Sequence, residues 1–331
     1  MNVDDSRPVL VTGAGGFIGG HLVGSLIGDG HQVRAVDIKP IARWYQRHDA
    51  ASNVVADLRL RDAAFDAIVG TKSVYNLACN MGGMGFIESN KAACMLNVLI
   101  DTHLLEAARD EQLDSYFYAS TACVYPGYLQ GDTAVTALKE ADTYPADPED
   151  GYGWQKLFGE RLCQNYAEDY GIAVRVGRYH NVYGPQGTWD GGREKAPAAI
   201  CRKVAHAVLS GRSEIEIWGD GEQTRSFMYI DDGIDGTRRL AASDIDTPLN
   251  IGSSEFVTIN QLVDVVSAIA GVELERRHIS AAPQGVRGRN SDNTEIKAKL
   301  GWEPSISLRD GLERTYAWIL DQVQSERSNS V

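Results

Sequence analysis

A tyrosine and a lysine four residues apart, Tyr152 and Lys156, form the first pair in this sequence with an obvious chemical use. Side chains at that spacing lie on one face of a helix. An ammonium group beside a phenol favours the phenolate and lowers its pKa, so Tyr152 could exchange a proton with an alcohol while hydride moves to or from a nicotinamide. The same spacing also occurs in plain surface pairs, so further residues must support this interpretation.

A hydroxyl group for the same reacting oxygen stands at Thr121, directly after an apolar run at Ser115–Ser120 that we expect to form a strand. Its hydrogen bond could orient the oxygen that Tyr152 protonates. Together with Lys156, these residues predict reversible oxidation of an alcohol.

A glycine-rich turn near the N-terminus is a candidate cofactor site, because it follows an apolar strand and opens an apolar helix. Glycines let the backbone approach a pyrophosphate, and the N-terminus of the helix then stabilises its negative charge. On its own the pattern fits a tight structural turn equally well. The residues that we expect to contact the cofactor are Gly13, Gly16, Phe17, Ile18 and Gly19.

Acidic residues at the ends of the next two expected strands extend this site. Asp37 lies 24 residues after Gly13, where a carboxylate accepts hydrogen bonds from ribose hydroxyls and repels a 2′-phosphate. Asp57 and Leu58 follow the third strand and could flank the adenine. Asp37 could instead cap a helix or turn, and Asp57 could mark a simple turn. Taken together, the glycine turn and these residues predict binding of NAD rather than NADP.

Alternating β-rich and helical stretches up to about residue 178 supply the scaffold for these residues. This alternation predicts an α/β fold with a doubly wound parallel sheet. We place a cofactor-binding domain at 1–178 and a smaller, mainly substrate-binding domain at 179–331, from which some segments return to the first domain. The expected strands are Val9–Thr12, Gln32–Asp37, Asn53–Ala56, Ser73–Ala78, Ser115–Ser120 and Ala173–Arg178.

Helical spacing of apolar residues near Leu308–Gln322 predicts a last helix, and we expect the polar tail Ser325–Val331 to fray.

Composition narrows the function classes. The 331 residues are 43% hydrophobic, enough for a substantial core, and the net charge of −13 argues against nucleic-acid or anionic-membrane partners. The N-terminal segment lacks the features of a secretory signal, and no apolar run approaches the roughly 18 residues of a membrane span. The five cysteines show no C-x-x-C pairing and the seven histidines no ligand spacing, so we expect no disulfide framework, no metal and a cytoplasmic location.

The cofactor turn, the Thr121/Tyr152/Lys156 group and their order along the chain resemble the nucleotide-sugar branch of the extended short-chain dehydrogenase/reductase superfamily, the NAD-dependent epimerase/dehydratases. The resemblance implies a Rossmann domain, a C-terminal nucleotide-sugar-binding domain and tightly bound NAD. It also implies a homodimer through a four-helix bundle formed by helices near residues 91–110 and 152–168.

The residue two positions after Thr121 separates activities within that branch. Dehydratases of the branch carry an Asp-Glu pair directly after the Ser or Thr, whereas this chain has Ala122 and Cys123. A thiol thus stands in the place of the carbon base, and the acid that expels water is missing. A small buried cysteine that only packs under the strand end is the plain alternative.

Longer blocks resemble those epimerases of the branch that invert both carbons beside C4 of a GDP sugar; they are NMGGMGFIESN, YASTACVYP, GRYHNVYGPQGTWDGGREKAPAAICRK, WGDGEQTRSF and GVRGRNSDN. The resemblance implies that Cys123 and Lys195 form an acid/base pair. Asn80 departs from the pattern, which has an acidic residue there. The resemblance implies substrate contacts at Gly82, Thr121, Cys123, Asn181, Glu194, Lys195, Lys203, Gln223, Arg225 and Arg289.

The chemistry explains why such residues are needed. An unactivated sugar C–H bond is too weak an acid for any side chain, but oxidation at C4 makes the protons at C3 and C5 exchangeable. A thiol and an amine on opposite faces could then remove and return them. Arg225 and Arg289 fit bidentate capture of a diphosphate. Surface salt bridges for the two arginines, and a solvated charge for Lys195, are the alternatives.

Two other functions stay open at this point. A C4-epimerase or related oxidoreductase acting on another GDP sugar, including a longer-chain bacterial one, would need only Thr121, Tyr152 and Lys156. A non-enzymatic NAD-binding regulator on this scaffold typically lacks the tyrosine or the lysine, and this chain has both.

Overall fold

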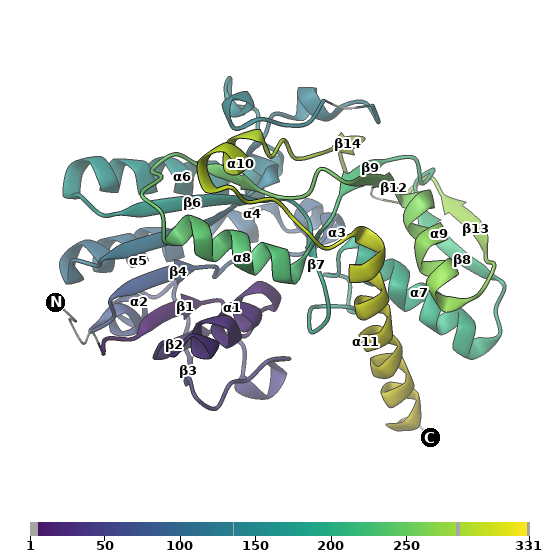
Figure 1. Cartoon of the computed structure of the whole chain (residues 1–331), viewed down its shortest axis with the longest axis horizontal. Coiled ribbons are helices and arrows are strands. Elements are labelled where there is room, and N and C mark those ends of the chain that lie inside the picture. Colours follow the sequence, from purple (N-terminus) through teal and green to yellow (C-terminus); the bar gives the residue numbers. More distant parts are fainter. Residues whose placement is uncertain (1–5, 135, 283–284, 330–331) are drawn as a thin grey trace.

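A seven-stranded parallel sheet forms the centre of the computed structural model, which describes residues 6–134, 136–282 and 285–329 (Figure 1). The strand order β11-β6-β5-β4-β1-β2-β3 changes direction between β4 and β1, and ligands of such sheets bind beyond the carboxyl ends of the strands at that point. The strands are β1 (Val9–Thr12), β2 (Val33–Asp37), β3 (Ser52–Val55), β4 (Ser73–Asn76), β5 (Ser115–Thr121), β6 (Val174–Tyr179) and β11 (Leu249–Ile251).

Alternate side chains of the strands enter two cores, one on each face of the sheet. Leu10 packs into the core with α2, α5 and α6, whereas Val9 and Val11 pack into the core with α1 and α8. This is the period of two that a strand imposes on its side chains. The covering helices are α1 (Phe17–Gly28), α2 (Arg61–Ile68), α5 (Val98–Glu111), α6 (Asp150–Tyr170) and α8 (Ile230–Ala241).

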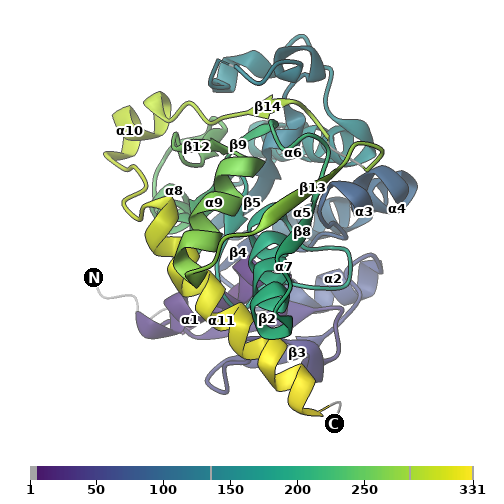
Figure 2. The ribbon, with the colours of Figure 1, turned by 90° about the vertical axis from the view of Figure 1, so that its right-hand side faces the viewer.

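The second half of the chain forms a smaller unit beside the carboxyl ends of the strands, and it also returns β11 to the central sheet. In this unit α7 (Ala196–Ser210), α9 (Ile259–Ala270) and α11 (Leu308–Asn329) pack against one another (Figure 2). Its short strands pair as β7 (Val182–Tyr183) with β10 (Met228–Tyr229), β8 (Glu214–Trp218) with β13 (Glu275–Ile279), and β9 (Thr224–Ser226) with β12 (Phe256–Thr258) and β14 (Gly288–Arg289).

Local signals fix the ends of several helices. Helix α7 begins with Pro197 in its first turn and ends at Gly211 in the left-handed conformation. Helix α9 begins with a capping box between Thr258 and Gln261. The remaining short elements are α3 (Met84–Ser89), α4 (Lys91–Met95), α10 (Thr294–Leu300), η1 (Ile41–Arg43), η2 (Ala122–Val124), η3 (Gly127–Gln130) and η4 (Glu140–Thr143).

The C-terminal tail corrects one expectation. Helix α11 continues to Asn329 instead of fraying from Ser325, while Ser330 and Val331 lie outside the described residues. The extension is held because Val323 is buried and the Arg327 guanidinium donates a 2.7 Å hydrogen bond to the carbonyl of Leu209 on α7. None of the helices in the described part of the chain is long and apolar enough to cross a bilayer.

Candidate active site

The glycine turn between β1 and α1 has the geometry of a phosphate-binding loop. Gly13 adopts φ +69°, and a Cβ there would lie 2.8 Å from the carbonyl oxygen of Leu77. Gly16 caps α1 with no side-chain hydrogen bond, and no acidic residue occupies the first turn. The first amide groups of α1 are therefore available to an anion. The pyrophosphate of a dinucleotide fits this turn, with Phe17, Ile18 and Gly19 forming the start of the helix.

Asp37 lies at the carboxyl end of β2, as the dinucleotide interpretation requires. Its side chain is buried, and one carboxylate oxygen accepts a 2.8 Å hydrogen bond from the Lys39 amide. Asp57 pairs with Arg59 at 2.6 Å, and this hydrogen-bonded pair lowers the pKa of the Asp57 carboxyl. Leu58 packs in the core shared by α2 and α5. The ribose and adenine contacts of these residues stay predictions.

Strand β5 ends at Thr121 and brings Cys123 to the same edge of the sheet. Thr121 is the last residue of the strand rather than the first after it, and its hydroxyl accepts a 3.3 Å hydrogen bond from the Cys123 amide. This bond starts the short 3-10 turn η2 and turns Cys123 out of the strand direction. The thiol is buried beside Tyr152 in a small apolar cluster.

Helix α6 is pressed against this turn through its first residues. The amide of Glu149 donates a 2.9 Å hydrogen bond to the Cys123 carbonyl, and a Cβ on Gly153 would collide with that same carbonyl. Only glycine permits this close approach. The contact places Tyr152 and Lys156 next to the carboxyl end of β5. Both side chains are buried, so they are not a solvated surface pair.

The protonation of Tyr152 differs from the expectation. We predicted that Lys156 lowers the pKa of the phenol, but burial raises that pKa well above 10, and the neighbouring Cys79 and Cys123 raise it further. A hydrogen bond with Thr121 works in the opposite direction and is outweighed. The lysine ammonium instead donates a 2.8 Å hydrogen bond to the carbonyl of Ala119.

Arg289 lies against the thiol rather than on the surface. It is 5% exposed; its Nη1 is 3.5 Å from the Cys123 sulfur and its Nη2 is 2.5 Å from Oε2 of Glu149. A surface salt bridge is therefore excluded for this arginine, while capture of a diphosphate stays a prediction. Burial raises the pKa of the Cys123 thiol, and Arg289 opposes that change without cancelling it.

Lys195, in the second half of the chain, lies near enough to Cys123 and Arg289 for their charges to affect its pKa. It caps the N-terminus of α7 and is half-buried, and burial lowers the pKa of its ammonium, while the nearby Cys123 works to raise it. The loop before it is fastened to the loop before α3, where Gly83 donates to the Arg193 carbonyl at 3.0 Å and Arg193 donates to Oδ1 of Asn80 at 3.0 Å. Asn80, the residue that departs from the family pattern, thus helps hold the loop of Lys195.

Two of the other expected substrate contacts adjoin β8 and β9, and two lie near α7 and α3. Asn181 bonds the Ser226 carbonyl at 3.1 Å, and Lys203 bonds the Glu216 carbonyl at 2.7 Å. Glu194 pairs with Arg202 at 2.7 Å, and Gly82 lies against the ring of Phe86.

Gln223 and Arg225 show features that suit a ligand. The Gln223 amide nitrogen bonds the Trp218 carbonyl at 3.1 Å, and its buried Oε1 has no hydrogen-bond partner within the described residues. The Arg225 guanidinium is directed to the carbonyls of Thr224 and Val286. Burial and the charge of Arg289 lower the pKa of Arg225 to about 10, so its positive charge is disfavoured in this surrounding.

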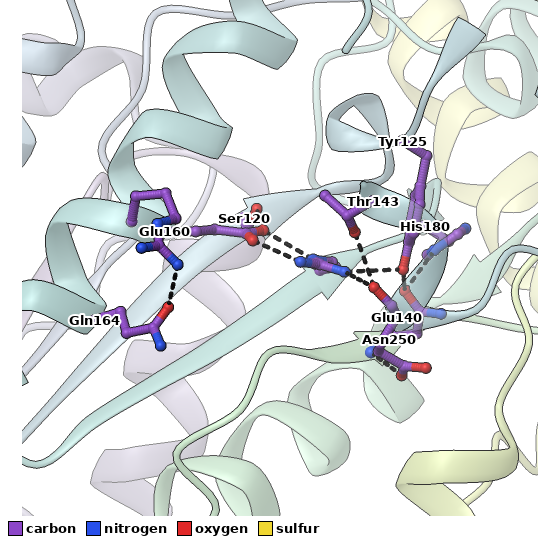
Figure 3. Close-up of polar contacts among 10 residues, drawn as sticks. Ser120, Tyr125, Glu140, Thr143, Glu160, Gln164, His180 and Asn250 are labelled. Carbon is purple, nitrogen blue, oxygen red and sulfur yellow. Dashed lines mark hydrogen bonds and ion pairs between the residues drawn. The ribbon is translucent and has the colours of Figure 1, made fainter. Parts of the chain in front are cut away.

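A buried polar network joins α6, β5 and β6 beside the site residues (Figure 3). Glu160 on α6 binds Arg178 on β6 at 2.7 Å and also bonds the hydroxyl of Ser120, the neighbour of Thr121. The network continues to Asn250, which accepts from Tyr125 at 2.6 Å and bonds the His180 ring at 3.0 Å. His180 in turn precedes Asn181, so the network anchors two strand ends that carry site residues.

A cavity of about 720 Å³ opens over the outer part of this network, between α6, β6 and β11. Its lining includes Glu160 and Arg178 but none of the residues that the sequence assigns to chemistry or binding. We therefore do not place the reaction there.

Sequence reasoning missed Glu149, Gln130 and Cys79. Glu149 stands three residues before Tyr152, which was the one available signal. Gln130 accepts from Nε of Arg289 at 2.6 Å, and Cys79 adjoins the Tyr152 phenol. Nothing in the local sequence of Gln130 or Cys79 indicates these contacts.

Comparison with known proteins agrees with this geometry. The family model described as the NAD dependent epimerase/dehydratase family matches residues 9–252. GDP-mannose 3,5-epimerase 1 of Oryza sativa subsp. japonica is 47% identical over 98% of this chain and 84% of its own length. GDP-mannose 3,5-epimerase of Arabidopsis thaliana is 46% identical over 98% of this chain and 85% of its own.

Solved structures give the same picture of the fold. UDP-glucuronic acid 4-epimerase from Bacillus cereus, in complex with UDP-glucuronic acid and NAD, superposes with a TM-score of 0.81 at 28% identity, over 96% of this chain and 100% of that one. UDP-glucose 4-epimerase from Thermotoga maritima, with UDP-glucose, gives 0.86 at 26% identity, over 96% and 100%.

Proposed function

This chain belongs to the NAD-dependent epimerase/dehydratase family, and from that premise we propose that it epimerises a GDP sugar in the manner of a GDP-mannose 3,5-epimerase. The observation that supports this most is that Cys123, buried beside Tyr152 at the end of β5, and Lys195, at the start of α7, are close enough for the charge of Cys123 to affect the pKa of Lys195. An enzyme that only transfers hydride has no use for a second acid/base pair at that position.

NAD fits this edge of the sheet, because the glycine turn leaves the first amides of α1 open to an anion and Asp37 offers a carboxylate at the end of β2. When bound, NAD supplies reversible oxidation of the sugar alcohol at C4. We assign pyrophosphate binding to Gly13, Gly16 and the first turn of α1, and ribose binding to Asp37.

At the C4 oxygen we assign proton transfer to Tyr152 and orientation to Thr121. Oxidation at C4 requires Tyr152 as the phenolate to accept the hydroxyl proton, and the return of hydride requires it as the phenol to give that proton back. The raised pKa of Tyr152 favours the phenol, the form that serves the second of these steps. Lys156, fixed to the Ala119 carbonyl, places its positive charge under the strand end where that oxygen would lie.

At C3 and C5 we assign proton exchange to Cys123 and Lys195. A carbonyl at C4 makes both neighbouring C–H groups acidic, and two groups on opposite sides of the ring can remove a proton from one face and return one to the other. Burial raises the pKa of the thiol and lowers that of the ammonium. Proton transfer between such groups and carbon is most effective when their pKa values are near the working pH, and the shift of Lys195 is in that direction.

For the nucleotide we assign binding to the residues around β8, β9 and β14. An anion beside Arg225 would relieve the burial cost that lowers its pKa. The free Oε1 of Gln223 can accept a hydrogen bond from a base, and Lys203, Asn181 and Gly82 complete the binding set.

The reaction in deuterated water tests this function. With GDP-mannose we expect inversion products that carry solvent deuterium at C3 and C5, and Cys123→Ala should lose that incorporation while keeping the fold. Inversion at C4 without solvent deuterium would instead identify a C4-epimerase. NAD binding without turnover on any GDP sugar would point to a regulator.

We further propose that the protein is a homodimer through α4, α5 and α6. Large apolar side chains on these helices and on the turn between α4 and α5 are exposed, namely Met95, Leu96, Leu99, Trp154 and Phe158. Light scattering after gel filtration should give twice the mass of one chain. Trp154→Glu should shift it to the monomer mass, whereas Tyr128→Glu, an exposed aromatic on another surface, should not. A monomeric parent protein would overturn the assignment.

A cytoplasmic location is part of the same proposal. All five cysteines carry free thiols, and the proposed chemistry needs the one at 123 in that state. A reducing compartment maintains it. Cell fractionation with an antibody to the protein tests the location.

A further inference from the structure

Asp101 on α5 is a fully buried carboxyl group to which the proposed chemistry gives no part. Three side chains donate hydrogen bonds to its two oxygens. The Tyr118 hydroxyl donates to Oδ2 at 2.8 Å, the Gln155 amide to Oδ2 at 2.6 Å and the Asn76 amide to Oδ1 at 2.9 Å. Burial raises the pKa of Asp101, while the charge of Lys156 and these three donors act to lower it. Three converging donors suit the ionised form, because a carboxylate has only acceptor sites.

The partners of Asp101 come from three different elements. Asn76 is the last residue of β4, Tyr118 lies in β5 and Gln155 lies in α6. Helix α6 approaches the strand closely here, since a Cβ on Gly159 would collide with the Tyr118 hydroxyl. The carboxylate therefore joins the sheet to the helix that carries the reactive residues.

The same network reaches the cofactor turn. Oδ1 of Asn76 accepts a 2.9 Å hydrogen bond from the hydroxyl of Thr12, the residue before Gly13. That hydroxyl also accepts from the amides of Leu77 and Ala78 at 3.2 and 3.1 Å. Asp101 is thus held in register with the strand end that leads into the glycine turn.

The Tyr118 ring connects Asp101 to Lys156. Its hydroxyl is bonded to the carboxylate, and its face lies 4.6 Å from the lysine Nζ. A phenol that donates to an anion becomes more electron-rich, and an electron-rich face attracts a cation more strongly. The Ala119 carbonyl supplies the second contact of the ammonium, at 2.8 Å.

We propose that Asp101 is a positioning residue for Lys156, which it reaches through Tyr118: its carboxylate orients and polarises the ring against which the ammonium lies. This inference rests on the proposed function, in which Lys156 places its charge under the reacting oxygen. Without the carboxylate the ring loses its anionic acceptor. The ammonium then keeps the Ala119 carbonyl as its strong contact, and its flexible four-carbon chain is free to move.

Crystal structures of the protein with bound NAD test the position of Lys156 without any sugar. The variants are Asp101→Asn, which removes the charge at similar volume, and Tyr118→Phe, which keeps the ring and removes its hydrogen bond. In each we expect Lys156 to show a second conformer or larger displacement parameters than in the parent protein. A Lys156 that keeps the parent position and order in either variant would overturn the proposal. If Asp101→Asn does not fold, Tyr118→Phe decides alone.

Rates per NAD-loaded site test the same coupling in the reaction and leave misfolded protein out of the comparison. Asp101→Asn should lower kcat on GDP-mannose by about tenfold, since small displacements of a reacting group are costly. KM should stay within about twofold, because uniform binding of the sugar is unchanged. Tyr118→Phe should behave alike, and the double variant should lose little more than either single one. Losses that multiply in the double variant would show that Asp101 does not act through Tyr118.

The matched control is Asp110→Asn, an exposed carboxylate on the same helix that pairs with Arg109 at 2.7 Å. It should keep the parent kcat and the parent order of Lys156. If the parent protein turns over no GDP sugar, the proposed function fails and the crystal structures still decide the relation of Asp101 to Lys156. If GDP-mannose is epimerised and Lys156 keeps its order in the variants, the inference alone is lost.

Discussion

The ammonium nitrogen of Lys156 lies 2.8 Å from the carbonyl oxygen of Ala119, so the lysine of α6 is fastened to the strand that ends in Thr121. The ammonium also lies 4.6 Å from the centre of the Tyr118 ring. Both contacts come from β5. The position of this charge is therefore set by the sheet as much as by the helix.

Substitution of this lysine should impair the reaction more than the fold. We expect Lys156→Met to lower kcat/KM on a GDP sugar by at least about 100-fold, since the charge under the reacting oxygen is lost. The long apolar side chain keeps most of the packing. Steady-state rates and a thermal melt check this, with the exposed Lys139→Met as control. A rate within threefold of the parent would remove Lys156 from the chemistry.

The loop of Lys195 offers a second prediction. Arg193 ties it to Asn80 at 3.0 Å, and the guanidinium also covers the Phe86 ring at 3.8 Å. Arg193→Ala should reduce kcat/KM by about tenfold, which corresponds to roughly 1.4 kcal/mol of lost positioning. Asn80→Asp keeps a partner for Arg193 and should retain most of the activity. Equal losses in the two variants would argue against the tether.

Protonation of His180 should destabilise the protein at acid pH. Burial lowers the pKa of this ring to about 3 from its ordinary 6.5. Below about pH 6.5 His180 is protonated in the unfolded chain but not in the folded chain. The free energy of unfolding is therefore unaffected above about pH 6.5 and falls by up to about 1.4 kcal/mol per pH unit down to about pH 3. The free energy of unfolding, measured with urea at each pH, should fall less steeply with decreasing pH for His180→Gln than for the parent protein. An equally steep fall in the two proteins would contradict the prediction.

The buried pair of Glu160 and Arg178 predicts a loss of stability without a specific loss of chemistry. Both side chains are 4% exposed and lie 2.7 Å apart. Arg178→Met leaves a buried carboxylate without its cation and should cost about 3–5 kcal/mol of unfolding free energy. The double variant Glu160→Leu, Arg178→Met should recover much of that loss. Chemical denaturation of the parent, the two single variants and the double variant checks this, and additive losses would show that the pair is not coupled.

Local patterns were enough to predict the sheet and the cofactor turn. The expected strands agree with β1 to β6 within two residues at each end, because alternating and β-branched apolar runs are a property of the segment itself. The glycine turn, Asp37 and the helical spacing of Tyr152 and Lys156 are local in the same sense. The tail of α11 was mispredicted because a contact to α7 holds it.

The meeting of Cys123 with Arg289 could not be predicted from spacing, since 166 residues separate them. The same holds for Glu149, which pairs with the guanidinium of Arg289 on β14, and for Asn80, which contacts a loop of the other unit. The direction of the Tyr152 pKa was also mispredicted, because burial and the neighbouring thiols raise it.

The sequence by itself determined which segments form strands and helices and which side chains have reactive chemistry, since both follow from residue type and short-range spacing. The tertiary structure decided which of those side chains meet and how far each is removed from water. Acidity depends on burial and on neighbouring charges, and both exist only once distant segments are packed together.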